Sequence, residues 1–199
     1  DVPERIYRKL KDAALNTPLE SIPFEREVDA DGIVPRPRFL DTEAINNEIL
    51  AELQEMHEEW SGVPLELSKA YGLRFYLNQS TLVWHLDKVE THVVSGILHI
   101  GSEPDQDTSP WPLEIIGHDG KVHKIVFKPG QLLFYESSKL SHGRPSTFNG
   151  TWYTSVFLHY RPRSWEVRRD DMSVSVPPHW WPSKQAAAKT GGGMIHDEL

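Results

Sequence analysis

Two histidines and one aspartate are the residues of this sequence best suited to hold a reactive metal ion. His85 and Asp87 lie two residues apart in a stretch that predicts a β-strand, where side chains two apart point to the same face. His142 follows a later predicted strand. Two imidazoles and one carboxylate suit a non-haem Fe(II) site, because they leave the opposite coordination positions open for substrate and O2. We therefore expect His85, Asp87 and His142 to form a metal site.

Two N-terminal helices and a series of short strands are the elements that must position these residues. Apolar residues recur at helical spacing over 3–15 and from Asp41 or Thr42 to about residue 60. From residue 73 the pattern favours strands rich in β-branched and aromatic residues, separated by turn signals. The expected strands are 73–77, 81–86, 92–100, 113–116, 122–127, 132–135 and 152–160. The chain is therefore expected to be α+β and mainly β, with a jelly-roll or barrel core and N-terminal supporting helices.

Length, charge and composition limit the possible functions. The 199 residues predict one domain over 1–185, with a helical part over 3–60, a jelly-roll core at about 72–162 and an irregular extension over 163–185. The net charge of −8 and the lack of a basic block argue against a nucleic-acid partner. No apolar run is long enough for a membrane span. The absence of cysteine excludes disulfides, thiolate ligands and a cysteine nucleophile.

The end of the sequence carries an address signal. Residues 186–199 read as a flexible tail that ends in the HDEL motif His196–Leu199. A retention receptor recognises this motif, so we expect a location in the lumen of the endoplasmic reticulum. Asn78 and Asn149 each begin a glycosylation acceptor pattern, and the sequence leaves their modification open.

The order of the motifs resembles that of a known enzyme family. The pair His85 and Asp87, the turn Pro129-Gly130 between two predicted strands, and then His142 resemble the 2-oxoglutarate- and Fe(II)-dependent dioxygenases, in particular their prolyl 4-hydroxylase-like branch. The resemblance covers roughly residues 73–162. It implies a double-stranded β-helix with the three residues as iron ligands, 2-oxoglutarate as co-substrate and ascorbate as a candidate cofactor. It also implies hydroxylation of proline in a protein or peptide, an activity that agrees with the retention motif.

The resemblance also calls for residues that bind 2-oxoglutarate. The branch usually has a lysine ten residues after its distal histidine, where this chain has Trp152. Arg144, two residues after the distal histidine, is the basic candidate, because a guanidinium can donate two parallel hydrogen bonds to a carboxylate. Tyr76 stands where the branch has a tyrosine that contacts the co-substrate, and His99 lies on a predicted strand that could line the cavity. Weaker basic candidates are Arg74 and Arg161.

Three alternatives to a prolyl hydroxylase remain open. The first is an aspartyl, asparaginyl or other hydroxylase of the same class, although aspartyl and asparaginyl hydroxylases characteristically lack a carboxylate ligand and this chain has Asp87. The second is a non-catalytic jelly-roll binding module with a vestigial metal site, an interpretation that Trp152 in place of the lysine supports. The third is a cupin-like metal enzyme that does not use 2-oxoglutarate.

The remaining expectations concern the walls of the site. We expect Trp84, Val94 and Ile97 to shield it from water. Leu82 replaces a second tyrosine that the branch often has, so the substrate pocket is expected to differ from that of typical prolyl hydroxylases. The remaining histidines are expected at the surface or in structural contacts: His92, His118, His123, His159 and His179.

Overall fold

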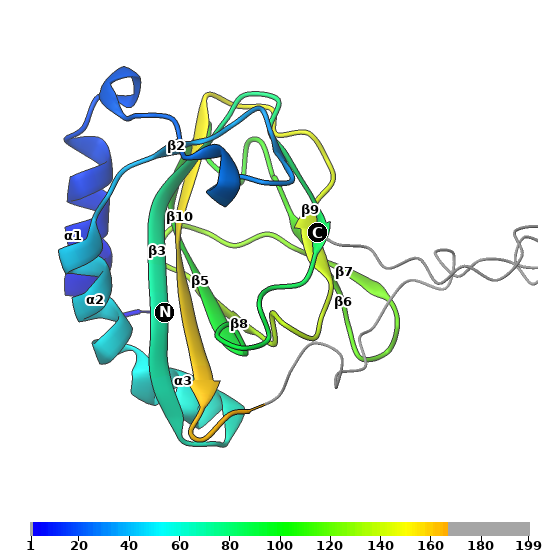
Figure 1. The fold of residues 1–199 in the computed structure, drawn as a ribbon. Coiled ribbons are helices and arrows are strands. Elements are labelled where there is room, and N and C mark those ends of the chain that lie inside the picture. The colour runs from blue at the N-terminus through cyan, green and yellow to red at the C-terminus, as the bar shows by residue number, and fades with distance from the viewer. Residues whose placement is uncertain (1, 167–199) are drawn as a thin grey trace, which may run out of the picture.

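Helices cover one side of two stacked β-sheets in this protein (Figure 1). The computed structural model describes residues 2–166. The α-helices are α1 (Glu4–Leu15), α2 (Glu43–Glu52) and α3 (Gln54–Ser61), and short 3-10 turns span Leu19–Ser21 and Glu27–Asp29. The strands are β1 (Ile33–Val34), β2 (Arg38–Phe39), β3 (Leu65–Leu77), β4 (Thr81–His85), β5 (Val94–Glu103), β6 (Leu113–Ile116), β7 (Val122–Ile125), β8 (Leu132–Tyr135), β9 (His142–Arg144) and β10 (Trp152–Pro162).

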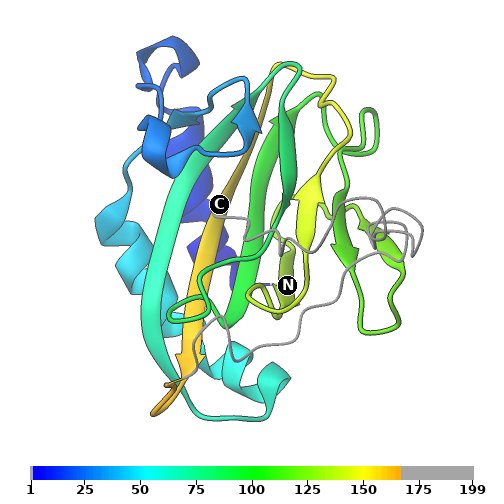
Figure 2. The same ribbon diagram turned by 45° about the vertical axis from the view of Figure 1, so that its right-hand side comes forward.

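The strands form two antiparallel sheets of five strands each. One sheet has the order β2-β3-β10-β5-β8 and the other has the order β1-β4-β9-β6-β7. Figures 1 and 2 show the helices against the outer face of the first sheet and the second sheet on its other side. This arrangement confirms the expected mainly β jelly-roll core with N-terminal supporting helices.

The apolar stripes of the helices attach them to the first sheet. Ile6, Leu10 and Ala14 of α1 are buried in one cluster with residues of β3, β5 and β10. The expectation of one continuous helix as far as residue 60 is wrong, because Leu53 separates α2 from α3 with a φ of −93° and a ψ of 2°. Leu53 is itself fully buried in the cluster, so the break keeps its side chain on the sheet.

Two strands differ most from the expectation. β3 begins at Leu65, well before the expected residue 73, and its early residues pair with the end of β10. Charged residues interrupt this part of β3, which explains the weak strand signal. β9 has three residues, too few for a periodic pattern, and it was not expected. It is an inner strand of the second sheet, between β4 and β6.

Two aromatic-rich clusters fill the space between the sheets. Both draw on residues of both sheets and the loops, and the metal-site candidates lie near them. One contains Ile33, Tyr76, Leu82, Trp111, Phe148 and Tyr153, and the other contains Ile97, Leu113, Ile115, Phe127, Tyr135 and Leu140. Among the described residues, no helix combines the length and the apolar character that crossing a bilayer requires.

His57 of α3 is an uncharged core residue. Its ring lies 4.7 Å from the ring of Phe134 and 4.2 Å from that of Tyr160, and its Nδ1 donates to the carbonyl of Leu53 at 2.7 Å. Burial lowers the pKa of His57 to about 4 from an ordinary value of 6.5. Folding therefore keeps this imidazole neutral over a pH range in which the unfolded chain would protonate it.

The stability of the fold should consequently decrease in mild acid. Between pH 6.5 and 4 His57 is protonated in the unfolded chain but not in the folded protein. His57 should therefore decrease the free energy of unfolding by on the order of 2 kcal/mol between pH 7 and pH 5. Urea unfolding at both pH values should show a smaller decrease for His57→Gln than for the wild type. His118→Gln, at an exposed histidine, is the control. An equal decrease in wild type and His57→Gln would contradict this assignment.

Candidate metal centre

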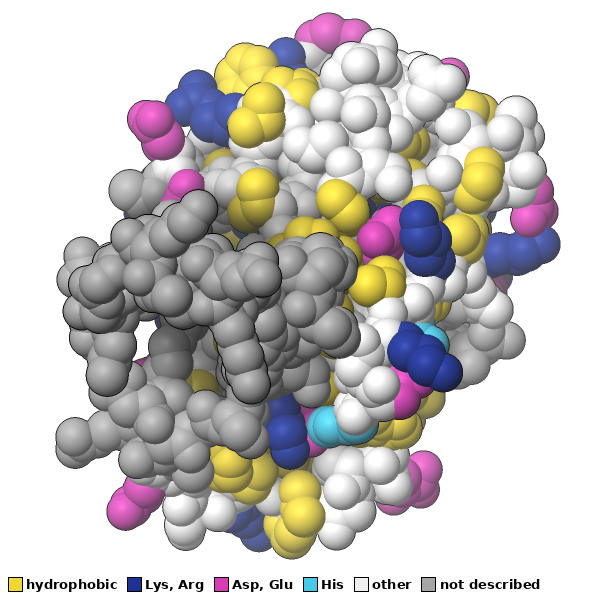
Figure 3. Space-filling model, turned by 90° about the vertical axis from the view of Figure 1, so that its right-hand side faces the viewer, with side chains coloured by type: hydrophobic (Ala, Val, Ile, Leu, Met, Phe, Trp, Pro, Cys, Tyr) yellow, Lys and Arg dark blue, Asp and Glu magenta, His cyan; other side chains and the backbone are white. Residues whose placement is uncertain are grey.

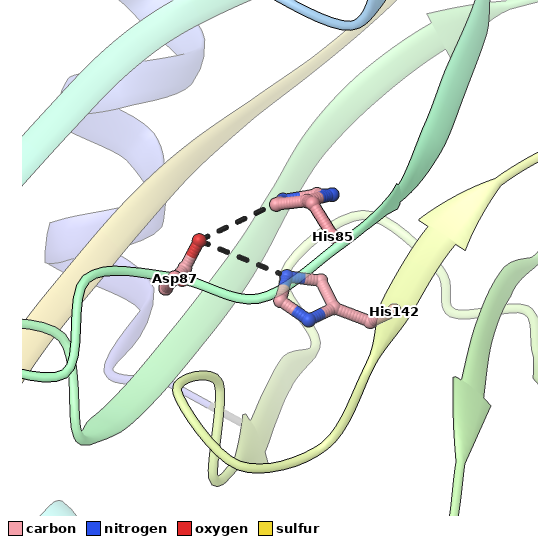
Figure 4. Close-up of side chains that lie close together, drawn as sticks. All are labelled: His85, Asp87 and His142. Carbon is pink, nitrogen blue, oxygen red and sulfur yellow. Dashed lines mark ion pairs between the residues drawn. The ribbon is translucent and has the colours of Figure 1, made fainter. Parts of the chain in front are cut away.

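Strand pairing brings the two candidate histidines together. His85 is the last residue of β4, His142 is the first residue of β9, and the register places them opposite each other. Their ring centroids lie 4.3 Å apart. Asp87 follows β4 in an irregular segment, and its carboxylate turns back toward both rings (Figure 4). One ligand atom from each of the three residues lies within 4.8 Å of the others, so the structure assembles the predicted triad.

Backbone hydrogen bonds fix which ring nitrogen of each histidine is available. The Nδ1 of His85 donates to the carbonyl of Val83 at 3.0 Å, and the Nδ1 of His142 donates to that of Leu140 at 2.9 Å. Both Nε2 atoms therefore carry lone pairs, at 3.6 Å and 3.9 Å from Oδ1 of Asp87. Two ligand atoms that share one ion, each at about 2.1 Å, lie at most about 4.2 Å apart. Each nitrogen therefore lies close enough to the Asp87 oxygen for the two atoms to share one metal ion.

The charge states near neutral pH also suit a metal. Burial, aided by His85, lowers the pKa of His142 to about 4. Burial opposes ionisation of Asp87, but the imidazoles of His142, His159 and His85 outweigh it and hold the pKa of the carboxyl below its usual range. A neutral imidazole and an ionised carboxylate are the forms that bind divalent metals.

A buried network holds Asp87 in place although it is outside the strands. Its backbone N–H donates to the carbonyl of Ser137 at 3.0 Å, and its Oδ2 lies 3.9 Å from Nδ1 of His159. Ser95 Oγ lies 2.6 Å from Ser137 Oγ and 2.8 Å from the same His159 nitrogen. These contacts come from β5, β10 and the segment after β8, so no local sequence pattern could reveal them.

A cavity of about 360 Å³ opens beside the triad. Ile97, Leu113 and Phe157 supply part of its apolar wall, and Leu82 lines it as well. Of the expected wall residues only Ile97 lines it, whereas Val94 belongs to the cluster under the helices. The polar and charged residues of the lining are Asp29, Asp31, Lys69, Tyr71, Arg74, Tyr76, His85, Asp87, Lys88, His92, Tyr135, His142, Arg144 and His159.

Arg144 is a buried cation without an acidic partner among the described residues. It pairs with Leu82 across β9 and β4, and it lines the cavity. Its guanidinium lies 4.5 Å from the ring centroids of Trp111 and Tyr153, and Nη2 donates to the Tyr153 hydroxyl at 2.8 Å. Nη1 donates to the carbonyl of Trp111. These contacts orient the guanidinium and leave donors free for an anion.

The other basic candidates for carboxylate binding are occupied or lie elsewhere. Arg74 lines the cavity but donates to both carboxylate oxygens of buried Glu25, at 2.7 Å and 2.6 Å. Arg161 pairs with Glu66 and does not line the cavity. Trp152, at the position of the family's lysine, packs with the cluster beneath the helices.

The structure separates the two remaining co-substrate candidates. Tyr76 lines the cavity and is almost fully buried, with its ring 5.1 Å from that of Trp111. His99 does not line the cavity, so the expectation that it would do so is wrong. Its ring stacks on Tyr153 at 4.2 Å, and its Nδ1 donates to the carbonyl of Thr154 at 3.1 Å. His99 lies on β5, as the expected strand 92–100 implies, and its side chain is fully buried.

Two histidines expected in surface or structural roles instead line the cavity. His92 and His159 stack with their ring centroids 3.8 Å apart, and His159 is 6% exposed. Tyr135 also lines the cavity, and its hydroxyl lies 3.5 Å from Nε2 of His142. Burial, followed by the charge of Asp87, raises the pKa of Tyr135 well above its usual value, so the hydroxyl stays protonated. Spacing along the sequence gave no sign of these three residues.

Comparisons with known proteins identify the fold. No family model matches the sequence, and a search of curated proteins finds no match. Similar structures include a prolyl-4-hydroxylase of Pseudomonas putida, with 18% identity over 82% of this chain and 89% of that chain, at a TM-score of 0.56. Another similar structure is a prolyl hydroxylase from Trichoplax adhaerens in complex with a hypoxia inducible factor oxygen degradation domain peptide fragment. It has 12% identity over 81% of this chain and 80% of that chain, at a TM-score of 0.59.

A third structure is HygX from Streptomyces hygroscopicus with nickel, 2-oxoglutarate and hygromycin B bound. It has 12% identity over 88% of each chain, at a TM-score of 0.58. The chain therefore has the fold of the 2-oxoglutarate-dependent oxygenases, and the resemblance seen in the sequence is confirmed at the level of the fold. Prolyl hydroxylases are among the proteins that share this fold.

Replacing one histidine of the triad should remove metal binding. His142→Ala deletes a ligand atom. Loss of a residue that only supports a ligand typically lowers metal affinity 10–100-fold, so we expect this variant to lose more than about 100-fold in metal affinity. Equilibrium dialysis with Co(II) measures it, and far-UV circular dichroism checks the fold. His118→Ala, at an exposed histidine outside the cavity, should bind Co(II) as the wild type does. Unchanged affinity in His142→Ala would remove His142 from the site.

Proposed function

We propose that the protein is an Fe(II)- and 2-oxoglutarate-dependent hydroxylase that acts on proline in a protein or peptide. The observation that supports this most strongly is the joint position of the triad and Arg144. The triad offers two imidazole nitrogens and one carboxylate oxygen to an ion, and Arg144 lines the same cavity with free donors. A metal next to an anion-binding group matches a co-substrate that chelates iron and ends in a second carboxylate.

The triad, Arg144, Tyr76 and the apolar wall of the cavity then have defined tasks. His85, Asp87 and His142 would hold Fe(II). When bound with 2-oxoglutarate, the metal would supply an oxidation in which one oxygen atom of O2 goes to the substrate carbon and the other to succinate, with release of CO2. Arg144 binds the far carboxylate of 2-oxoglutarate and Tyr76 contacts the co-substrate. Apolar residues such as Ile97 and Phe157 exclude water.

The similar structures and the sequence support the choice of proline as the proposed substrate. Two of the similar structures are prolyl hydroxylases, and one of these was solved with a peptide fragment. The proposed location is the lumen of the endoplasmic reticulum, with the HDEL motif His196–Leu199 as the ligand of a retention receptor. These four residues lie outside the described part of the chain, so this location rests on the sequence motif.

Turnover assays with peptides test the proposal. Proline-containing peptides, Fe(II), 2-oxoglutarate, O2 and ascorbate should yield succinate together with a peptide 16 Da heavier, and fragmentation should place the oxygen on proline. Asp87→Ala should yield neither product. Succinate without a modified proline in any peptide would contradict prolyl specificity. Failure of the metal-loaded protein to consume 2-oxoglutarate would favour a binding module or a metal enzyme of another type.

A change at Arg144 should weaken the binding of the co-substrate more than the binding of the metal. Arg144→Gln removes the cation that faces the cavity, so we expect the 2-oxoglutarate concentration for half-maximal succinate formation to rise at least about tenfold, with Co(II) affinity within about twofold. Arg144→Lys should show an intermediate effect, because lysine keeps the charge but loses the paired geometry. The control Arg161→Gln lies outside the cavity and should behave as the wild type. An unchanged requirement in Arg144→Gln would move the carboxylate site elsewhere.

A further inference from the structure

We infer that Lys69 and Lys88 bind an acidic side chain next to the target proline of a peptide. The cavity would then select substrates that carry a negative charge at this place. Both lysines line the cavity that contains the metal triad. The peptide and the proline rest on the proposed function. The preference for an acidic neighbour rests on the charges of the cavity wall.

Lys69 and Lys88 are exposed cations without acidic partners among the described residues. Lys69 extends from β3, and its ammonium lies 4.7 Å from the ring centroid of Tyr71. Lys88 begins a turn, because its carbonyl accepts the backbone N–H of Thr91 and that of His92. The two lysines therefore reach the same cavity from different segments of the chain.

Lys69 and Lys88 line the same cavity as the stacked rings of His92 and His159, whose centroids lie 3.8 Å apart. Two ammonium groups at one cavity, without acidic partners in the described part of the chain, give it a positive potential that attracts an anion.

Two of the other charged residues that line the cavity are already in ion pairs. Arg74 is paired with buried Glu25, and Asp29 is paired with Arg26. Asp31, which also lines the cavity, is exposed and has no ion pair among the described residues.

The position of Lys88 sets where the acidic group must be. Lys88 directly follows the candidate metal ligand Asp87 in the chain, so an anion bound there lies near the metal. The acidic residue is therefore expected immediately beside the target proline. The positive charge of Lys69 and Lys88 also contrasts with the charge of the whole protein, which is −8. Figure 3 shows basic and acidic side chains interspersed on one outer face of the protein.

A pair of labelled peptides tests the inference by binding alone. One contains Gly-Glu-Pro-Glu-Gly and the other Gly-Gln-Pro-Gln-Gly, and fluorescence anisotropy is read anaerobically with Fe(II) and 2-oxoglutarate present. The wild type should bind the acidic peptide at least about fivefold more tightly, since two partly solvated ion pairs are each modest. The preference should shrink as the salt concentration rises from 50 to 500 mM, because salt screens exposed charges.

Charge-matched variants identify the source of the preference. Lys69→Gln/Lys88→Gln should bind both peptides with equal affinity, and each single variant should lose part of the preference. The control Lys11→Gln/Lys121→Gln changes the net charge equally at exposed sites that do not line this cavity and should retain it. Circular dichroism and Co(II) affinity verify that the fold and the metal site persist.

Three results would overturn the inference. They are equal affinity of the wild type for the two peptides, absence of binding of either peptide, and a preference that survives in the Lys69→Gln/Lys88→Gln variant. Failure of the proposed function gives a different result, because 2-oxoglutarate consumption would then be absent while the peptide-binding preference could still be measured.

Discussion

The pairing of β4 with β9 is the interaction on which the candidate site depends. It sets His85 opposite His142 and Leu82 opposite Arg144. A shift of the register by one residue would turn the side chains of one strand to the other face of the sheet. The same pairing therefore controls the two metal-binding nitrogens and the position of the cation that we assign to 2-oxoglutarate.

Asp87 lies outside the strands, so strand pairing does not fix its position. Buried polar contacts hold it instead. Its neighbours Ser137, Ser95 and His159 come from the first sheet and from the loop after β8, so the two sheets must pack correctly before the carboxylate is held. A buried polar network is stabilising only when its members are satisfied. Here the site and the packing of the two sheets depend on each other.

The elements that the sequence predicted well have long periodic signals or a motif of fixed spacing. The apolar stripe of α1, the mainly β core and the triad His85, Asp87 and His142 belong to this group. The break at Leu53 and the strand β9 were missed, because tertiary packing decides the first and β9 is too short for a pattern. The cavity histidines His92 and His159 were missed because only the packing of β10 beside β5 and the segment that precedes β5 brings them together.

The most direct measurement is an anaerobic titration of the metal-free protein with Fe(II) and then 2-oxoglutarate, followed by visible absorption. If the triad holds iron and Arg144 directs the co-substrate onto it, a charge-transfer band should appear only after 2-oxoglutarate is added. The band should saturate at one equivalent of iron and be absent in the Asp87→Ala variant. Iron binding without any band at saturating 2-oxoglutarate would contradict the account, because the metal would then not be chelated by the co-substrate.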